Sequence, residues 1–374
     1  MSRTRIFVTG IRGIPGVIGG IEAHCEELLP RIAALAPDLE IEVVGRRRFL
    51  DPNIVEFKGV AVTALPSPLG VNTEAVGATL LGVLYARKRR AAIVHIHAIG
   101  PALLAPLARA LGMRVIITHH GADYGRARWG RIAKLVLRLG ERCGMSAADR
   151  IIAVAPSLAE RLKVDFPSRA DAVRYIPNGA PALDDSLSAA DVLTRFGLES
   201  KDFVLSVGRL VPEKGFDYLI RAFRDSGTDR KLALVGAPTH QSAYARDLLG
   251  QADDQVVFLG PQPRAVLRRL YEQADLFVLP SFHEGLAISA LEAANCATPM
   301  LLSDIAANRD IDLPPGNYFP VGDERALAEL LVRPAEEFTY DVGEVTRRFD
   351  WDRIAEQTLA VYRELLSSAA ALDG

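Results

Sequence analysis

Short runs of β-branched and aliphatic residues alternate with longer amphipathic segments along most of the chain, and this alternation restricts the possible folds more than any other feature. Repeated units of strand, helix and parallel strand produce such a pattern. In the first half we expect strands at residues 5–10, 41–45, 92–97, 114–120, 150–155 and 173–178. The pattern restarts in the second half, with strands expected at 203–209, 231–236, 256–260, 276–281 and 299–303. The sequence therefore predicts the α/β class with parallel sheets.

The chain has 374 residues, which exceeds what one hydrophobic core usually supports. A polar stretch, APALDDSLSAAD, separates the two series of expected strands and is the best candidate for a linker. We therefore expect two Rossmann-like, doubly wound domains over residues 1–180 and 181–350, followed by a C-terminal helical segment over 351–374.

Composition excludes several classes of protein. A formal net charge of −2 gives no overall attraction to nucleic acid, so we expect no nucleic-acid partner. The three cysteines have no metal-ligand or disulfide-framework spacing, which fits a reducing compartment. The N-terminus lacks the apolar core of a signal peptide, and the longest apolar run is interrupted by His, Pro and Arg. We expect a cytoplasmic protein that is at most peripheral to a membrane.

The segment GIRGIPGVIGGIE, residues 10–22, places five glycines between the first expected strand and a helix. Such a loop allows close backbone approach to a phosphate at the helix N-terminus. A merely tight turn is the alternative. The spacing differs from Gly-x-Gly-x-x-Gly, which disfavours an NAD(P)-dependent oxidoreductase, although the arginines at 46–48 could face a 2′-phosphate.

Two other strand ends carry candidate functional side chains. In SVGRLVPEKGF, Arg209 and Lys214 follow an expected strand, and this pair of cations suits a diphosphate. In ITHHGADY, His119 and His120 end an expected strand, where an imidazole can act as a hydrogen-bonding or acid–base group. The alternatives are solvated surface cations and structural histidines.

Residues 281–296, SFHEGLAISALEAANC, contain Glu284 and Glu292 in an otherwise uncharged stretch. Apolar residues cover most of the circumference of a helix over 286–296, so we expect this helix to be buried. If both glutamates are helical, their Cα atoms lie roughly 12 Å apart. Paired glycosidase carboxyls lie within about 5.5 Å or about 6.5 to 9.5 Å, which disfavours hydrolysis. Binding two ends of one polyhydroxylated ligand is the better interpretation.

Together these motifs resemble the nucleotide-sugar-dependent glycosyltransferases of family 4, which have the GT-B fold. Glu284 and Glu292 match the Glu-x7-Glu motif, while Arg209 and Lys214 match Gly-Arg-Leu-x-x-x-Lys-Gly. The glycine-rich start and HHGADYGRARWGR resemble more narrowly the rhamnosyltransferase-like subgroup that builds bacterial surface polysaccharides.

The resemblance implies a role for each matching residue. Glu292 would accept hydrogen bonds from the ribose of the donor nucleotide, and Glu284 would contact hydroxyls of the transferred sugar. Arg209 and Lys214 would neutralise the leaving diphosphate. The remaining implied donor contacts come from Gly19 and Gly20 in the first domain, and from the backbone amides of Leu286, Ala287 and Ile288. His120 matches the histidine that lies near the transferred sugar, and His119 is the weaker candidate.

Some positions depart from the family pattern. Ala287 and Ala297 replace residues that are usually Gly or Pro, which affects the expected donor geometry rather than the class of activity. Asp310 and Asp312 have the spacing of a metal-binding Asp-x-Asp, but they precede the turn LPPGN and read as a surface loop. We therefore expect no metal site and no cofactor, since the nucleoside-diphosphate sugar is a substrate.

Residues 126–142 carry six cations, one acid, Trp129 and several leucines, as expected for a basic amphipathic helix. Such a helix can lie on an anionic membrane, where a lipid-linked acceptor would be found. An ordinary solvated helix face is the alternative. A second basic cluster lies at 87–90.

The resulting prediction is a retaining hexosyltransferase of polysaccharide biosynthesis, with rhamnose as the candidate sugar, that uses a glycan or a lipid-linked acceptor at the inner face of the cytoplasmic membrane. Retention, an interdomain cleft that closes on the donor, and a last helix that crosses back to the first domain are implied by the family. A nucleotide-sugar epimerase and a non-catalytic sugar-nucleotide-binding protein are the alternatives.

Overall fold

The computed structural model describes residues 3–17, 19–68, 74–121, 124, 130–181, 186–238 and 242–370. The chain divides into two compact units, one formed by Met1–Gly179 with Asp350–Gly374 and the other by Ala180–Phe349. Each unit contains one largely parallel sheet with helices packed on it. The predicted fold class is confirmed.

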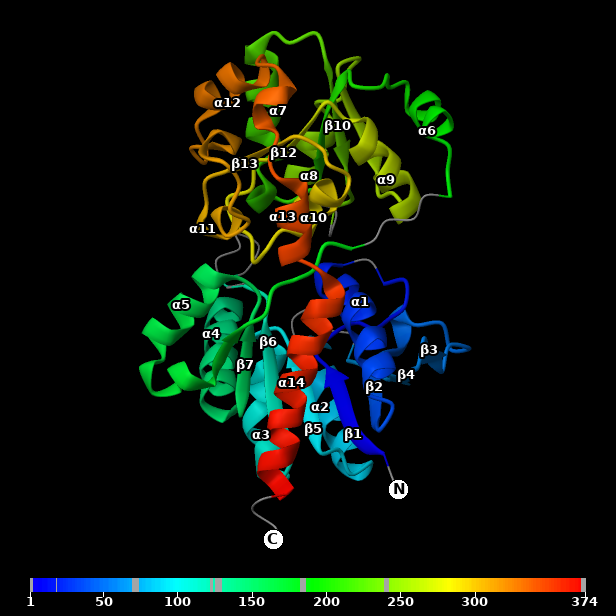
Figure 1. Ribbon diagram of the computed structural model, residues 1–374, viewed down its shortest axis with the longest axis vertical. Helices are drawn as coiled ribbons and strands as arrows, with labels where there is room; N and C mark the ends of the chain where they lie inside the picture. The colour runs from blue at the N-terminus through cyan, green and yellow to red at the C-terminus, as the bar shows by residue number, and fades with distance from the viewer. Residues whose placement is uncertain are drawn as a thin grey trace. The chain divides into compact units, whose positions relative to one another are not determined.

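In the first unit, the described residues form a sheet of eight strands in the order β3-β4-β2-β1-β5-β6-β7-β8 (Figure 1). The strands are β1 (Thr4–Thr9), β2 (Leu39–Arg46), β3 (Glu56–Phe57), β4 (Val60–Leu65), β5 (Ile93–His97), β6 (Arg114–His119), β7 (Arg150–Ala153) and β8 (Val173–Tyr175). Only β3 pairs antiparallel, with β4. The sequence did not predict β3 and β4, and β8 ends at Tyr175, before the predicted end at 178.

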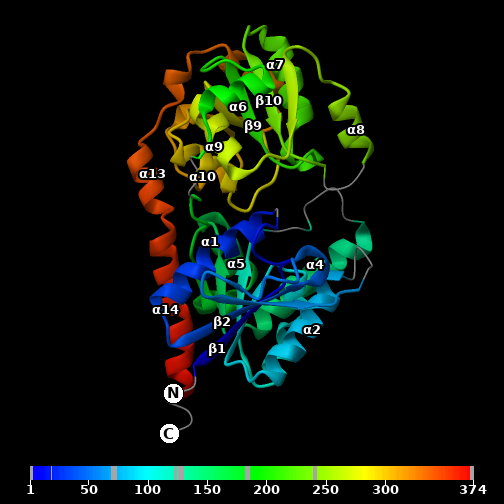
Figure 2. The same ribbon diagram turned by 90° about the vertical axis from the view of Figure 1, so that its right-hand side faces the viewer.

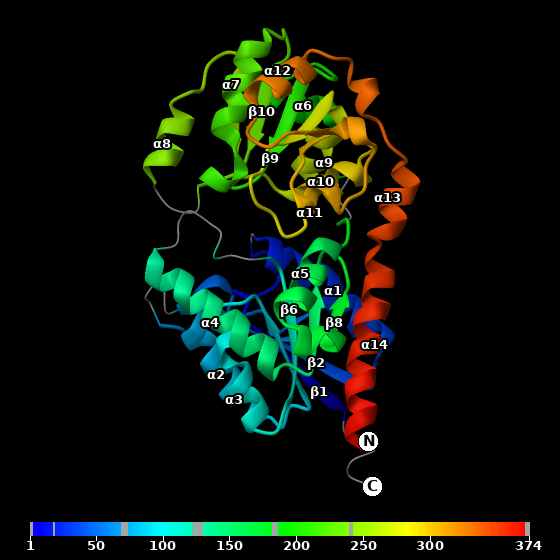
Figure 3. The same cartoon turned by 90° about the vertical axis from the view of Figure 1, so that its left-hand side faces the viewer.

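Helices cover both faces of this sheet. They are α1 (Gly20–Leu35), α2 (Glu74–Lys88), α3 (Ala105–Ala110), α4 (Arg131–Ala147), α5 (Pro156–Asp165) and α14 (Trp351–Ala370), with 3-10 turns η1 (Arg47–Phe49), η2 (Pro101–Leu104) and η4 (Pro167–Ala172). Helices α1 and α14 pack together on one face, and α2, α3 and α4 lie on the other (Figures 2 and 3). Side chains alternate between these two layers along β1: Ile6 and Val8 join the α1–α14 core, whereas the ring of Phe7 contacts Tyr85 of α2.

The C-terminal helix α14 belongs to the first unit. Its helical periodicity was evident in the sequence, and its apolar face enters the core that covers β1, β2 and β5. The buried hydroxyl of Tyr362 lies 2.8 Å from Nδ1 of His95 on β5. At its start, Trp351 packs against Gly179. Burial of two large aromatic side chains and one internal hydrogen bond therefore hold α14 on the first sheet.

The second unit has, within its described residues, a six-stranded parallel sheet in the order β11-β10-β9-β12-β13-β14. The strands are β9 (Phe203–Val207), β10 (Lys231–Val235), β11 (Val256–Gly260), β12 (Leu276–Leu279), β13 (Met300–Ser303) and β14 (Tyr318–Phe319). The helices are α6 (Ala189–Phe196), α7 (Phe216–Ser226), α8 (Ala243–Leu249), α9 (Arg264–Gln273), α10 (Ile288–Asn295), α11 (Ala306–Arg309), α12 (Glu324–Leu331) and α13 (Val342–Arg348), with 3-10 turns η5 (Pro212–Lys214), η6 (Pro315–Asn317) and η7 (Ala335–Phe338). The sequence predicted the other five strands but not β14.

No helix within the described ranges has both the length and the apolar character needed to cross a lipid bilayer.

Replacing Gly179 by Ala tests how the start of α14 packs on the first unit. A Cβ at Gly179 would lie 2.4 Å from the ring of Trp351, so the indole must move. We expect Gly179→Ala to lower the free energy of unfolding of the first unit by about 1 to 3 kcal/mol, measured by urea denaturation. Gly130→Ala is the matched control, because a Cβ at Gly130 meets no atom of the described residues within 4 Å. Equal stabilities of the two variants would contradict this packing.

Candidate active site

The carboxyl ends of β9 and β12 meet near the middle of the second sheet. Strand β9 pairs with β10 on one side and with β12 on the other, so the order of the strands changes direction at β9. Open parallel sheets bind their ligands at such a change of direction. Arg209 and Lys214 follow β9, and Glu284 follows β12. The structure therefore brings these three predicted residues to one edge of the second sheet.

A glycine allows the loops after β9 and β12 to approach each other. Gly215 has a φ of +68°, and a Cβ there would lie 2.4 Å from the carbonyl oxygen of Pro280. Beside it, the backbone N–H of Phe282 donates to the carbonyl oxygen of Glu213 at 2.9 Å. A side chain at position 215 would separate the two loops, so this glycine is needed to bring Lys214 to the segment 281–284.

The ammonium group of Lys214 forms an ion pair with Oε1 of Glu284, and the two side chains are only 13% and 11% exposed. The hydroxyl of Ser281 donates to the same carboxylate oxygen at 2.6 Å. Two oppositely charged groups that are largely withdrawn from water attract each other more strongly than an exposed pair would. Lys214 and Glu284 therefore hold each other at the edge of the sheet.

Glu292 lies on α10, half-buried, and its Oε2 accepts a hydrogen bond from the hydroxyl of Tyr271 at 3.0 Å. Burial, together with the neighbouring carboxylate, raises the pKa of Tyr271, so the phenol keeps its proton and donates it. Tyr271 comes from α9 and was not singled out from the sequence. The sequence gives little indication of this role: Tyr271 is an aromatic residue with a hydroxyl group, a few positions before the expected strand 276–281.

The predicted helix 286–296 was placed too early. Helix α10 begins at Ile288, with Ala287 as its N-cap, so Leu286 and Glu284 lie in the preceding loop. The estimate of 12 Å between the two glutamates assumed that both were helical and therefore does not apply. The prediction that the helix is buried is confirmed, because Ala290, Leu291, Ala293 and Ala294 are buried. The N-terminus of α10 begins four residues after Glu284, on the same loop.

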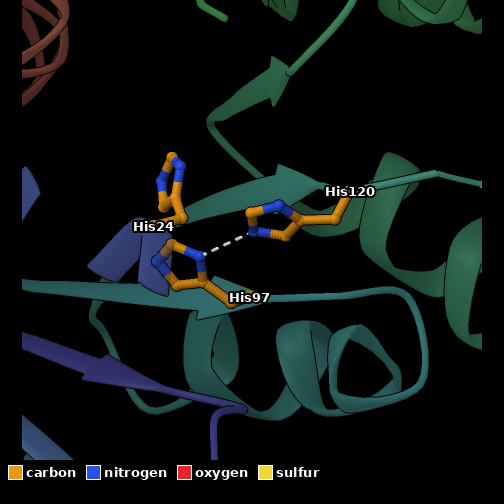
Figure 4. Close-up of side chains that lie close together, drawn as sticks. All are labelled: His24, His97 and His120. Atoms are coloured by element: carbon orange, nitrogen blue, oxygen red, sulfur yellow. Dashed lines mark hydrogen bonds between the residues drawn. The ribbon is translucent and has the colours of Figure 1, made fainter. Parts of the chain in front are cut away.

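In the first unit, the half-buried His120 directly follows β6. Its Nε2 lies 3.0 Å from Nδ1 of His97, the last residue of β5, and the two rings are stacked (Figure 4). The ring of His24 on α1 meets His120 edge-on, with centroids 5.0 Å apart. Burial, followed by the neighbouring histidines, lowers the pKa of His120 well below its ordinary value. His120 is therefore neutral at neutral pH, and the sequence reasoning missed the two histidines that accompany it.

His119, the weaker candidate, is buried and has structural partners. Its Nε2 lies 2.9 Å from Oε1 of Glu141 on α4, and its Nδ1 accepts from the N–H of Gly121 at 3.2 Å. Arg161 donates to the same oxygen of Glu141 at 3.0 Å. Burial opposes ionisation of Glu141, but the bonds from His119 and Arg161 outweigh it and hold the pKa of that carboxyl below its ordinary value. The geometry thus favours His120 over His119.

Gly19 and Gly20 lie at the start of α1, as N-cap and first residue. A Cβ at Gly19 would fall 2.2 Å from Oε2 of Glu22 and 2.1 Å from Nη2 of Arg12. Arg12 and Glu22 form a bidentate pair, with distances of 3.0 and 2.8 Å. A side chain at position 19 would therefore displace the ends of the Arg12 and Glu22 side chains and disturb their ion pair, which gives this glycine a structural role beside the predicted diphosphate role.

Two other predicted features have structural partners. Arg46 and Arg48 both pair with Glu74 of α2, so these arginines of the 46–48 cluster already face a carboxylate. Asp312 pairs with Arg348 at 3.0 Å in the turn after α11.

The predicted site residues form two groups. The second unit contains Arg209, Lys214, Glu284 and Glu292, and the first contains Gly19, Gly20 and His120.

Two family models match the chain: Glycosyltransferase Family 4 over residues 18–182, and Glycosyl transferases group 1 over residues 195–332. D-inositol 3-phosphate glycosyltransferase of Salinispora arenicola is 30% identical, over 94% of this chain and 89% of its own. Alpha-maltose-1-phosphate synthase of Mycolicibacterium smegmatis is 27% identical, over 94% of this chain and 97% of its own.

Solved structures share the fold. Sucrose-phosphate synthase from Thermosynechococcus elongatus superposes with a TM-score of 0.81 at 22% identity, over 98% of this chain and all 100% of the other. Anabaena HepE in complex with UDP-glucose gives a TM-score of 0.75 at 19% identity, over 97% and 100% of the two chains. At these identities the likeness concerns the fold alone.

The two sheets have the GT-B fold, and the family models and relatives identify the protein as a glycosyltransferase that transfers a sugar from a nucleotide sugar. The chain belongs to the glycosyltransferases of family 4. The alternative of a nucleotide-sugar epimerase is not favoured by any of these relatives.

Proposed function

We propose that this glycosyltransferase moves a hexosyl group, with retention of configuration, from a nucleoside-diphosphate sugar to a hydroxyl of a glycan or lipid-linked saccharide in polysaccharide biosynthesis. The observation that supports it best is the contact between Lys214 and Glu284 at the β9–β12 edge. It places the cation proposed for the diphosphate directly beside the carboxylate proposed for the sugar. The rhamnosyl assignment rests on the resemblance of two segments alone and stays a prediction.

The donor would extend along this edge. Glu292 would hold the ribose, and the phenol of Tyr271 fixes the orientation of that carboxylate. Arg209 and Lys214 would balance the charge that develops on the leaving diphosphate. Lys214 would then exchange the carboxylate of Glu284 for a phosphate oxygen, which frees Glu284 to accept hydrogen bonds from sugar hydroxyls. The amides at the N-terminus of the eight-residue helix α10, at Leu286, Ala287 and Ile288, would face the anion.

The first unit would supply the acceptor side and His120. A neutral imidazole can donate or accept a hydrogen bond at a sugar hydroxyl without adding charge. Gly19 and Gly20 would present the N-terminus of α1, a helix of 16 residues, to the diphosphate. Because two protein cations serve the diphosphate, we propose that no metal ion is required. The free cysteines Cys25, Cys143 and Cys296 fit our proposal of a cytoplasmic location.

Alanine at Arg209 or Lys214 tests the diphosphate assignment. Each charge-assisted contact contributes about 1.5 to 3 kcal/mol, so each variant should lose roughly ten- to a hundredfold in turnover. The measurement is release of nucleoside diphosphate from the donor in the presence of an acceptor extract. Arg325→Ala, at a side chain that is 90% exposed on α12, is the control and should match the wild type. Wild-type turnover in both site variants would refute the assignment.

We further propose that α4 contacts an anionic membrane surface. Three of its apolar residues, Ile132, Leu135 and Leu139, are exposed by 81%, 67% and 49% and lie on one stripe of the helix. The opposite side packs tightly, since a Cβ at Gly140 would lie 2.2 Å from the carbonyl oxygen of Ile99. The stripe therefore faces outward because small residues hold the other side of α4 against η2.

Cations border this stripe. Arg131, Lys134, Arg138 and Arg142 belong to α4, whereas its one acid, Glu141, is buried against His119. The remaining predicted residues, Arg126, Arg128 and Trp129, lie outside the described part of the chain. On the same face of the sheet, α2 exposes Leu80, Leu81 and Leu84 (Figure 3). Apolar side chains bordered by cations match a bilayer surface of acyl chains and anionic headgroups.

Vesicle flotation tests this surface. Leu135→Gln should reduce the fraction bound to anionic vesicles about tenfold, because burying one leucine side chain contributes about 1.5 to 3 kcal/mol. Leu249→Gln is the matched control, at a leucine that is 41% exposed on α8 of the second unit. Neutral vesicles should bind little of any variant. Equal flotation of wild type and Leu135→Gln, or no preference for anionic vesicles, would count against the proposal.

A further inference from the structure

Three imidazoles converge in the first unit from segments that are distant in the sequence. His24 comes from α1, His97 from the end of β5, and His120 from the residue after β6 (Figure 4). One ring nitrogen of each lies within 4.8 Å of those of the others. The cluster His24–His97–His120 stands where the strand order of the first sheet changes direction, since β1 lies between β2 and β5.

One buried nitrogen of this cluster has no hydrogen-bond partner in the part of the chain that the structure describes. Nδ1 of His24 lies 2.9 Å from Oδ1 of Asn178, an oxygen that can only accept, so Nδ1 carries the proton. Nε2 of His24 therefore presents a lone pair, and it has no hydrogen-bond partner among the described residues, in a side chain that is 3% exposed. Leaving a buried acceptor unsatisfied costs about 1 to 3 kcal/mol, so a ligand at this point would remove a penalty.

The other two histidines also have a lone pair to offer. Nδ1 of His97 and Nε2 of His120 are 3.0 Å apart, so one of them donates its proton to the lone pair of the other. An ion that binds both nitrogens would break this bond, and the proton of the donor ring would move to the other nitrogen of that ring. His24 and His97 are buried and His120 is half-buried, and burial favours the uncharged form of an imidazole. Neutral imidazole is the form that binds metal ions.

We infer that the His24–His97–His120 cluster is a binding site for one divalent transition-metal ion such as Zn²⁺ or Co²⁺. Imidazole nitrogen suits these ions, whereas Mg²⁺ and Ca²⁺ require oxygen ligands. Nitrogens bound to Zn²⁺ at about 2.1 Å in a tetrahedron lie about 3.4 Å from one another, so ring shifts of about 1 Å would close the set. Three protein ligands leave the fourth position open.

The residues around the cluster resemble those that orient the ligands of a metal site. Oδ1 of Asn178 accepts a hydrogen bond from Nδ1 of His24, on the other side of the ring from the proposed metal-binding nitrogen, and such partners orient metal-ligating histidines. His95 stacks against His97 with ring centroids 4.3 Å apart, and it is itself held by Tyr362 and Thr118 at 2.8 and 2.7 Å. The ring of His97 is thereby fixed before any ion arrives.

A metal ion in this cluster would also affect sugar transfer, and this effect rests on the proposed function. His120 is our candidate for the contact with the transferred sugar, and a metal ion would occupy the same imidazole. The ion would therefore inhibit transfer rather than support it, in keeping with a reaction that requires no metal. Binding of the ion to the protein alone is a separate observation, so it stands or fails independently of the transferase assignment.

Titration of tag-free, chelator-treated protein with Co²⁺ tests the site. We expect visible absorption bands of four-coordinate Co²⁺ that saturate at one equivalent and disappear when Zn²⁺ is added. His24→Gln and His120→Gln should each weaken binding by at least about tenfold, and Asn178→Ala, which changes no ligand, should weaken it about ten- to a hundredfold. His283→Gln, at a histidine of the second unit, is the matched control and should bind as the wild type does.

Circular dichroism would verify that each variant folds, and the half-buried His120 is the position where substitution should disturb packing least. Wild-type protein that binds Co²⁺ no more tightly than His120→Gln would overturn the inference. Unchanged binding in a folded His24→Gln variant would overturn it as well. Loss of binding in both variants, with retention in His283→Gln, would establish the site.

Discussion

Each sheet of this protein changes the direction of its strand order at its first strand, and the functional groups depend on that constraint. In the first unit β1 lies between β2 and β5, and in the second unit β9 lies between β10 and β12. Right-handed connections then run to opposite faces of the sheet, so the loops that leave adjacent strands diverge and expose the carboxyl edge. Lys214 and Glu284 meet at that edge in the second unit, and His97 and His120 meet at the corresponding edge in the first.

The sequence predicts this architecture well where strands are buried on both faces. The expected strands at 114–120 and 231–236 contain the apolar runs 115–117 and 232–235, and β6 and β10 occupy them. The two-residue strands β3 and β14 escape prediction, because a pair of residues has no periodicity. The start of α10 was placed two residues early, because Leu286 and Ala287 are buried although they precede the helix, so the apolar pattern extends beyond it.

For the candidate site, the sequence identifies residue types but not their partners. Arg209, Lys214, Glu284 and Glu292 were recognisable because they follow strands in a motif. The contact of Lys214 with Glu284 depends on Gly215, whose left-handed backbone brings two separate loops together. Tyr271, His24 and His97 were missed because each reaches its site from an element distant in sequence. Such convergence is a property of the tertiary fold and has no local signal.

The central claim is that a nucleoside diphosphate binds at the carboxyl edge of the second sheet. The most direct measurement is the thermal unfolding midpoint of the protein with uridine, guanosine and thymidine diphosphates and their sugars. A ligand at a hundred times its Kd stabilises the native state by about 2.7 kcal/mol, so one nucleotide series should raise the midpoint by several degrees. The Glu292→Gln variant should lose most of that rise, because the ribose contact is weakened. Unchanged midpoints across all three series would contradict the account.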